Sequence, residues 1–265
     1  MRNRLIFAGQ FVFTLAVAAF LIVPAILSMV AGVTANYFRG VRSGLTLHWV
    51  MQVWELYAET IARSFAVAFV TLGVTLSVGI PAAYALHVRG GRLSRAIEEI
   101  ITLPLAVPGL AIALGLLLTY GGFGDFRRSW LFIVVGHIVF TLPFMVRSVM
   151  AVFSLIDIKT LDESASSLGA SPWRRFRDVI VPNARSGILA GSLMVVTLSL
   201  GEFNLTWMLH TPLTKTLPVG LADSYASMRL EVASAYTLVF FVMIIPLLVA
   251  MQILADRDVR QGTRR

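Results

Sequence analysis

The stretch that decides the fold lies at residues 64–86 and reads SFAVAFVTLGVTLSVGIPAAYAL. It holds no charged side chain over its whole length. A helix rises 1.5 Å per residue, so this stretch is long enough to cross the roughly 30 Å hydrocarbon core of a bilayer. It therefore predicts a transmembrane helix, and with it an all-α membrane protein.

Five further stretches have a similar length and composition, so the sequence predicts six transmembrane helices. Three of the five carry no charge, and each of the other two contains one ionisable residue, His137 or Glu202. The five stretches are Leu5–Val33, Ile100–Tyr120, Ser129–Val146, Gly187–Leu209 and Val232–Ala255.

The overall composition excludes several classes of protein. Of the 265 residues 57% are apolar and 14% are charged, whereas soluble domains carry about 25% charged residues. The net charge of +8 does not indicate a nucleic-acid partner, because Lys and Arg punctuate the apolar stretches and do not gather on one soluble face. The absence of cysteine excludes disulfides and thiolate sites. The four histidines are scattered, so neither a metal site nor a catalytic residue is predicted.

The distribution of Lys and Arg predicts the orientation. Six crossings put both termini on one side, and the loops on that side hold fifteen of the 22 Lys and Arg, against seven in the opposite loops. By the positive-inside rule both termini are predicted to be cytoplasmic. The longest cytoplasmic loop is then 148–186, with its structured part at 154–186. No duplicated half is found, so residues 1–265 are expected to form a single transmembrane domain whose core spans lie at 64–255.

This cytoplasmic loop contains signals for two short helices. Thr160-Leu161-Asp162-Glu163 fits a capping box and predicts a helix start at Thr160, and Gly169 suits the left-handed position at which such a helix ends. Ser171-Pro172 predicts the start of a second helix. The apolar stripe of this second helix comprises Trp173, Phe176 and Ile180, and the helix is predicted to end at Pro182. An exposed apolar face among arginines is typical of a docking surface for a partner protein.

The same loop resembles the signature of the permeases of binding-protein-dependent ABC importers. That signature reads Glu-Ala-Ala, three residues, Gly-Ala, five residues, Phe, two residues, Val or Ile, two residues, Pro. The chain matches it at seven of eight positions and departs from it at Ser164. The corresponding residues are Glu163, Ser164, Ala165, Gly169, Ala170, Phe176, Val179 and Pro182. Residues 79–86 and 103–108 also look like the family's second and third spans, so the resemblance covers about 64–255.

The resemblance implies the type I ABC importer permease fold in the bacterial cytoplasmic (inner) membrane, with the loop forming a coupling hairpin between the fourth and fifth helices. It also implies three partners, namely a cytoplasmic ABC ATPase dimer, a second permease and an extracytoplasmic solute-binding protein. In the polyamine-type systems that the chain resembles the second permease is usually a different homologous chain, and another copy of this chain is the alternative. The chain has no Gly-x-x-x-x-Gly-Lys-Ser/Thr phosphate loop. It is therefore not expected to be an enzyme or to carry a cofactor, and ATP and Mg²⁺ are expected on the partner ATPase.

The fifth predicted span contains the candidate substrate path. A carboxylate at the depth of Glu202 is costly unless it is paired or faces water, which marks a functional site by default. The neighbouring Gly201, Phe203, Asn204 and Thr206 add polar groups and a position where the helix can break. In the family this segment lies at the translocation path. Pairing of Glu202 with a neighbouring permease remains an alternative to contact with solute.

The charge of Glu202 favours a cationic solute, such as putrescine, spermidine or another amine-bearing compound like an aminophosphonate. The same machine for an oxyanion (sulfate or molybdate) or for ferric iron stays open. A secondary transporter driven by an ion gradient would use Glu202 and His137 as its coupling pair. His137 has no acidic partner at helical spacing, so helix packing is its expected role. The hairpin argues against a secondary transporter, because such carriers do not need it. A scaffolding subunit is the third possibility, and it predicts no effect of substitutions in the fifth span on flux.

Overall fold

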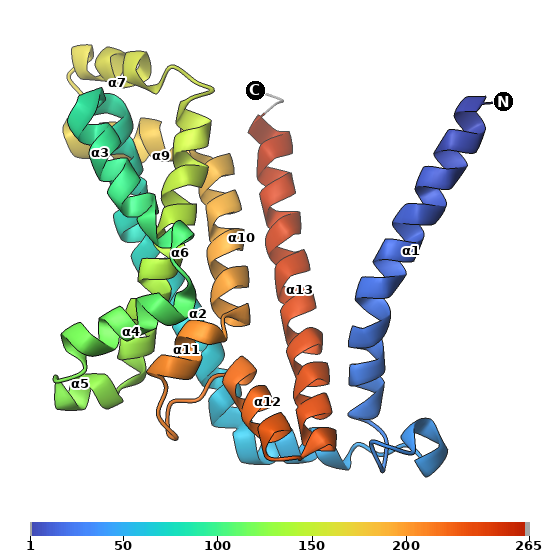
Figure 1. The fold of residues 1–265 in the computed structure, drawn as a ribbon. Coiled ribbons are helices and arrows are strands. Elements are labelled where there is room, and N and C mark those ends of the chain that lie inside the picture. Colours follow the sequence, from blue (N-terminus) through green and yellow to red (C-terminus); the bar gives the residue numbers. More distant parts are fainter. Residues whose placement is uncertain (1, 263–265) are drawn as a thin grey trace. The chain divides into compact units, whose positions relative to one another are not determined.

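The structure, a computed structural model, describes residues 2–262, and the side chains among them except at residues 2, 3, 5 and 254–262. This part of the chain consists of helices and loops with one isolated β-bridge, between Thr34 and Leu45, which confirms the all-α prediction (Figure 1). The helices in chain order are α1 (Arg2–Ala31), η1 (Gly40–Ser43), α2 (His48–Arg89), α3 (Gly91–Thr102), η2 (Leu103–Ala106), α4 (Gly109–Tyr120), α5 (Gly124–Arg128), α6 (Trp130–Phe153), α7 (Ile158–Ser167), α8 (Pro172–Arg175), η3 (Phe176–Ile180), α9 (Val181–Asn183), α10 (Arg185–Gly201), α11 (Asn204–Leu209), α12 (Leu217–Ala226) and α13 (Leu230–Gly262).

Four helices in the described residues are long and apolar enough to cross a bilayer, and the number rises to six if each of two bent helix pairs counts as one crossing. The four are α1, α2, α6 and α13. They contain the spans predicted at 5–33, 64–86, 129–146 and 232–255 to within a few residues, which is the usual uncertainty of helix ends.

The third predicted span, Ile100–Tyr120, is not one helix, and that prediction needs correction. The helical segment Gly91–Ala106 and α4 meet at an angle of 109°. At the break Val107 is extended, with φ −101° and ψ 128°. Pro108 explains this, because its ring disfavours helical geometry in the preceding residue and it has no N–H to continue the helix.

The fifth predicted span, Gly187–Leu209, is also interrupted. Helix α10 ends at Gly201, Glu202 is extended with ψ 123°, and α11 begins at Asn204. The expectation of one continuous helix was therefore wrong, although the sequence had pointed to Gly201 as a position where a break is tolerated. The interruption, residues 201–204, is called the span-5 break below.

The chain divides into two compact units, and the first comprises residues 2–59 and 220–243. In it the end of α1 packs closely on α13, since a Cβ on Gly32 would lie 2.6 Å from the backbone nitrogen of Ala235. The Ser28 hydroxyl also donates to Thr237 at 3.4 Å. None of the apolar window of α1 is buried. A long apolar helix left uncovered in this way is suited to lipid or to a partner chain.

The second unit comprises residues 60–219 and 244–262, and its centre is the pair α6 and α10, which lie side by side (Figure 1). Glycines allow the close approach, because a Cβ on Gly187 would lie 2.5 Å from the Ser148 carbonyl oxygen. One buried cluster, around Met145, Val149 and Phe153, joins α6 to the loop helices. A second cluster joins α4, α6 and α11. The two clusters anchor the two candidate sites.

Candidate functional site

The loop between α6 and α10 folds into a helical hairpin, residues 158–183, but its first helix begins earlier than predicted. Asp157 is the N-cap of α7, and its side chain accepts hydrogen bonds from the Thr160 backbone N–H at 3.2 Å and from the Thr160 hydroxyl at 2.6 Å. These bonds hold the pKa of Asp157 below its usual range. The prediction of a capping box at Thr160–Glu163 is therefore wrong. An aspartate three residues upstream is an equally good cap, and Glu163 instead lies 3.9 Å from Lys159.

The end of α7 is as predicted. Gly169 has φ +80°, in the left-handed region that glycine tolerates best. The Gly169 N–H donates to the Ser166 carbonyl at 2.9 Å and the Ala170 N–H donates to the Ala165 carbonyl at 3.1 Å, which is the hydrogen-bond pair of a Schellman motif. The glycine therefore sets the angle at which the chain turns into the second helix.

The second helix begins where predicted, because the Ser171 side chain accepts from the Arg174 N–H at 3.4 Å and Pro172 follows in the first turn. It does not end at Pro182, however. A π-turn at Phe176–Ile180 restarts the helix at Val181, and helical structure continues to Asn183. Pro182 then lies in the first turn of α9, a position at which the missing N–H of proline is tolerated. The prediction of a stop at Pro182 was wrong for this reason.

The predicted coupling residues lie on two faces of the hairpin. Ile158 and Ile180 are fully buried, and the half-buried Phe176 and Val179 pack on the same cluster as α6. The opposite face is exposed at Glu163, Ser164 and Gly169, with Pro182 also exposed and Ala165 and Ala170 half-buried. Two large apolar side chains of the hairpin are also exposed, Leu168 at 88% and Trp173 at 66%. The signature thus consists of an anchoring part and an outward-facing part.

An ion pair that the sequence did not reveal joins the two helices of the hairpin. The Arg175 guanidinium donates to Asp162 Oδ2 at 3.1 Å, and the carboxylate side chain is 9% exposed. The other carboxylate oxygen and Arg175 Nε are buried without a hydrogen-bond partner in the described structure. The two residues are thirteen positions apart on different helices, so no local pattern connects them.

Glu202 turns back onto its own chain. Its Oε1 accepts from the Leu205 N–H at 2.9 Å, and Oε2 accepts from the Thr206 N–H at 2.9 Å and from the Thr206 hydroxyl at 3.0 Å. The carboxylate therefore caps α11, and the positive end of the helix dipole favours its charge. This arrangement meets the requirement that a carboxylate within a membrane be paired.

Glu202 is one end of a buried polar network that includes a histidine predicted only to pack. His137 Nε2 lies 2.8 Å from the Thr206 hydroxyl, and Nδ1 lies 2.7 Å from the Ser199 hydroxyl. His137, Ser199 and Thr206 are 1%, 4% and 0% exposed. These four residues, Ser199, His137, Thr206 and Glu202, are called the His137 network. Sequence reasoning missed Ser199, because its bond to His137 bridges 62 positions.

The span-5 break also presents an outward face. Of the predicted path residues, Gly201 and Asn204 are exposed, Glu202 and Phe203 are half-buried, and Thr206 is fully buried. Phe203 contacts Trp207, which is 38% exposed, with ring centroids 5.4 Å apart, and Trp207 contacts His210 at the same distance. An aromatic row therefore lies beside an exposed amide, and the sequence had not assigned Trp207 or His210 to the site.

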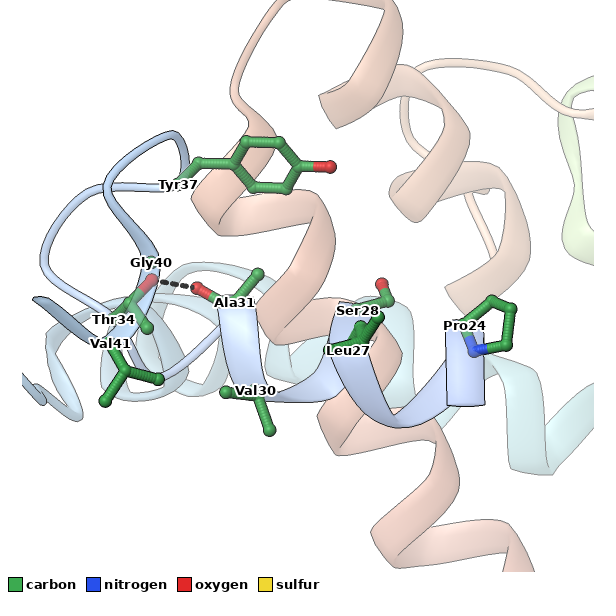
Figure 2. A pocket seen from close by; sticks show the side chains of 9 residues that line it. All are labelled: Pro24, Leu27, Ser28, Val30, Ala31, Thr34, Tyr37, Gly40 and Val41. Atoms are coloured by element: carbon green, nitrogen blue, oxygen red, sulfur yellow. Dashed lines mark hydrogen bonds between the residues drawn. The ribbon is translucent and has the colours of Figure 1, made fainter. Parts of the chain in front are cut away.

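A hollow of about 580 Å³ lies apart from these residues, in the first unit, between the end of α1 and η1 (Figure 2). Its lining is mainly apolar and comprises Pro24, Leu27, Ser28, Val30, Ala31, Thr34, Tyr37, Gly40 and Val41. It contains none of the predicted path residues. Among the residues whose side chains the structure describes, no group of three or more acidic or histidine side chains is placed to hold a metal ion.

Comparisons with known proteins agree with this architecture. A family model described as "Binding-protein-dependent transport system inner membrane component" matches residues 75–260. The putative 2-aminoethylphosphonate transport system permease protein PhnV of Salmonella typhimurium is 26% identical over 240 residues, covering 90% of each chain. The molybdenum transport system permease protein ModB of Azotobacter vinelandii is 29% identical over 227 residues, covering 80% of this chain and 99% of that one.

The fold also matches a solved structure, that of a bacterial alginate ABC transporter in complex with an alginate pentasaccharide-bound periplasmic protein. The TM-score is 0.71 at 17% identity, and the match covers 99% of this chain and 96% of that chain. At this identity the likeness concerns the fold alone.

Proposed function

Because the chain belongs to the family of binding-protein-dependent transport system inner membrane components, we propose that it forms half of the translocation path for an amine-bearing organic solute. Membership makes it a permease subunit of an ABC importer, a multi-pass protein of the inner membrane. Such permease subunits are not themselves enzymes. An extracytoplasmic binding protein delivers the solute in this proposal.

The outward face of the hairpin is the observation that carries the coupling part of the proposal. Glu163, Ser164 and Gly169 are exposed on the hairpin, and so are the large apolar side chains of Leu168 and Trp173. Apolar side chains of this size at the surface are typical of an interaction site. We propose that an ABC ATPase dimer, which binds ATP and Mg²⁺, docks there. Both termini then lie on the same, cytoplasmic side.

A second permease chain completes the path in this proposal. Five core spans of one chain border only half of a pathway, and the exposed apolar surface of the spans allows a partner of similar composition to pack against them. As in the polyamine-type systems that the chain resembles, we propose a different homologous chain. Purification of the intact complex, followed by mass spectrometry of its subunits, tests this directly.

The coupling role is tested by substitutions on the outward face. Charge reversal of Glu163, as Glu163→Lys, is expected to abolish ATPase association and uptake while membrane insertion is unchanged. Gly169→Asp should act similarly, because it adds a negative charge at an exposed position of the hairpin. Gly169→Asn is the matched control, since asparagine tolerates the left-handed region. If uptake survives both Glu163→Lys and Gly169→Asp, the hairpin does not couple.

The span-5 break supports an amine-bearing solute. The exposed amide of Asn204 and the aromatic row of Phe203, Trp207 and His210 provide a hydrogen-bonding group and π-faces, and π-faces attract cations. The carboxylate of Glu202 adds negative charge close by. The relative PhnV, named for 2-aminoethylphosphonate, makes an aminophosphonate the specific candidate within this class.

A molybdate-like oxyanion is the second candidate, and one observation favours it. Three donors of the chain itself already satisfy the Glu202 carboxylate, so its charge repels an anion less than an unpaired carboxylate would. The relative ModB, named for molybdenum transport, belongs to this alternative. Ferric iron has no corresponding observation in its favour.

Two experiments separate these solutes. Native mass spectrometry of the cognate binding protein identifies the ligand it holds, and an aminophosphonate or polyamine is expected. Uptake of that ligand by the reconstituted importer should depend on ATP, and Glu202→Gln should change its rate or apparent affinity. A bound oxyanion, or unchanged uptake in Glu202→Gln, contradicts the amine proposal. Uptake by the chain alone, driven by a proton gradient, contradicts the importer reading altogether.

A further inference from the structure

The His137 network connects three segments that are far apart in the sequence. His137 lies on α6, Ser199 on α10, and Thr206 on α11, and Glu202 lies in the break between the last two helices. The three heavy-atom distances along the chain of side chains are 2.7, 2.8 and 3.0 Å. Thr141 adds a fourth bond, donating its hydroxyl to the His137 carbonyl at 2.7 Å.

The hydrogen bonds of the network run in one direction. Glu202 receives three donors and donates none, as an ionised carboxylate must, so the Thr206 hydroxyl proton points to Oε2. Thr206 can then only accept from His137, which requires the proton on Nε2. In a neutral histidine Nδ1 is then the acceptor, and the Ser199 hydroxyl donates to it. This direction assigns a single neutral tautomer to the histidine, which the neighbours fix.

The packing around the network explains why a histidine on α6 can control α11. A Cβ on Gly136, the residue before His137, would lie 2.5 Å from Leu205 and 2.6 Å from Leu209. The absence of a side chain there seats α11 directly on α6. Leu205, Thr206 and Leu209 form the buried face of α11, and Asn204 and Trp207 form its exposed face.

We propose that His137, oriented by Ser199, is a positioning residue that acts through Thr206 to hold Glu202 on the amides of α11, and so fixes the shape of the span-5 break. The inference rests on the proposed function only in that the exposed face of the break borders the solute path. His137 touches no solute itself. Its N–H at Nε2 donates to the Thr206 hydroxyl oxygen and so keeps the hydroxyl proton directed at Glu202. A side chain that cannot donate from this position leaves the Thr206 hydroxyl free to turn away from Glu202.

Two pairs of variants separate this role from simple filling of space. Thr206→Val removes the hydroxyl at nearly constant volume, whereas Thr206→Ser retains it. His137→Gln keeps a donor near the position of Nε2, whereas His137→Asn keeps a polar group only near that of Nδ1. The chain contains no cysteine, so Asn204→Cys introduces a single thiol at the break. Its rate of reaction with a water-soluble maleimide, in membranes containing the assembled importer, reports the local shape.

The expected result is a change of about tenfold in the labelling rate in Thr206→Val and His137→Asn, the scale of one lost hydrogen bond to a charged group. In Thr206→Ser and His137→Gln the labelling rate should stay within about twofold of the parent rate, because both variants keep the hydrogen bond. A thiol at Val41→Cys, 59% exposed in the other compact unit, is the control and should be unaffected throughout.

Equal labelling rates within each pair overturn the proposal. If Thr206→Val does not accumulate in the membrane, the His137 pair gives the answer alone, because both of its members retain a polar side chain of similar size. The labelling requires no solute and no ATP. A negative result therefore counts against the positioning role and leaves the proposed function untouched. The expected labelling changes with unchanged ATP-dependent uptake would support the positioning role and count against a solute path at the break.

Discussion

Helical structure is interrupted both at the hairpin and at the span-5 break, and the two regions differ in the exposure of their polar side chains. In the hairpin the charged side chains of Lys159, Glu163 and Arg177 lie exposed, and one ion pair is covered. Beside the break the polar side chains of His137, Ser199 and Thr206 are buried, and each has a partner from another segment or from the chain nearby.

The difference follows from the solvent that each region is built for. Water satisfies a charge at a loop surface, so the shape of the hairpin depends on local caps such as Ser171 and Gly169. Hydrocarbon offers no hydrogen-bond donor or acceptor, so each polar group in a span must find a partner within the protein. A broken helix in the membrane is therefore tied to its neighbours, whereas a loop hairpin can present its free face to a partner.

The covered ion pair of the hairpin should give the largest effect. Arg175→Met removes the guanidinium and leaves the Asp162 carboxylate buried without its cation, which is expected to destabilise the hairpin by about 3 kcal/mol. Thermal unfolding of the purified importer, followed by hydrogen exchange in α7, measures the loss. Arg177→Met is the matched control, because the Arg177–Asp178 pair is exposed, and it should change nothing measurable. Equal effects of the two substitutions would contradict the distinction between covered and exposed charge.

The network in the span should give an intermediate effect. His137→Leu deprives Ser199 and Thr206 of one partner each, and about 1–2 kcal/mol of stability should be lost, as for other hydrogen bonds between membrane helices. The midpoint of thermal unfolding in detergent reports it. Ser77→Ala serves as the comparison, since that exposed hydroxyl only bonds the Gly73 carbonyl of its own helix. A His137→Leu protein as stable as Ser77→Ala would show that the network does not hold the break.

The smallest effect concerns the cap of α7 and depends on pH. Because the hydrogen bonds from Thr160 lower the pKa of Asp157, its stabilisation is complete above the ordinary value of 3.8 and is lost as the pH falls through the lowered value. Hydrogen exchange of the first turn of α7 should therefore accelerate in acid, after correction for the intrinsic rate. Asp157→Asn, which caps without titrating, should show no such acceleration. Identical pH profiles would exclude the carboxylate as the cap.

The two regions also differ in how much the sequence could foretell. The helices, four of the spans and the caps at Gly169 and Ser171 follow from patterns within a few residues. The start of α7 was misplaced because Asp157 and Thr160 are both suitable caps and only one is used. The break at Pro108 was missed because the apolar run around it looked continuous.

The contacts of the break lay beyond such patterns. His137 meets Ser199 and Thr206 across 62 and 69 positions, and no spacing rule links residues so far apart. Glu202 was identified because an unpaired carboxylate is energetically costly in a membrane. Its partners, however, are mainly backbone amides, which almost every residue possesses. The candidate site could therefore be located from the sequence, while its hydrogen bonds could not.

We propose above all that the outward face of the hairpin binds the ATPase and that the span-5 break borders the path of the solute. Glu163→Lys and Glu202→Gln, compared side by side in the reconstituted importer, test it by co-purification of the ATPase and by ATP-dependent uptake. We predict that Glu163→Lys loses both the ATPase and uptake, whereas Glu202→Gln keeps the ATPase and changes the rate or apparent affinity of uptake. Normal uptake in Glu163→Lys, or loss of the ATPase in Glu202→Gln, would contradict it.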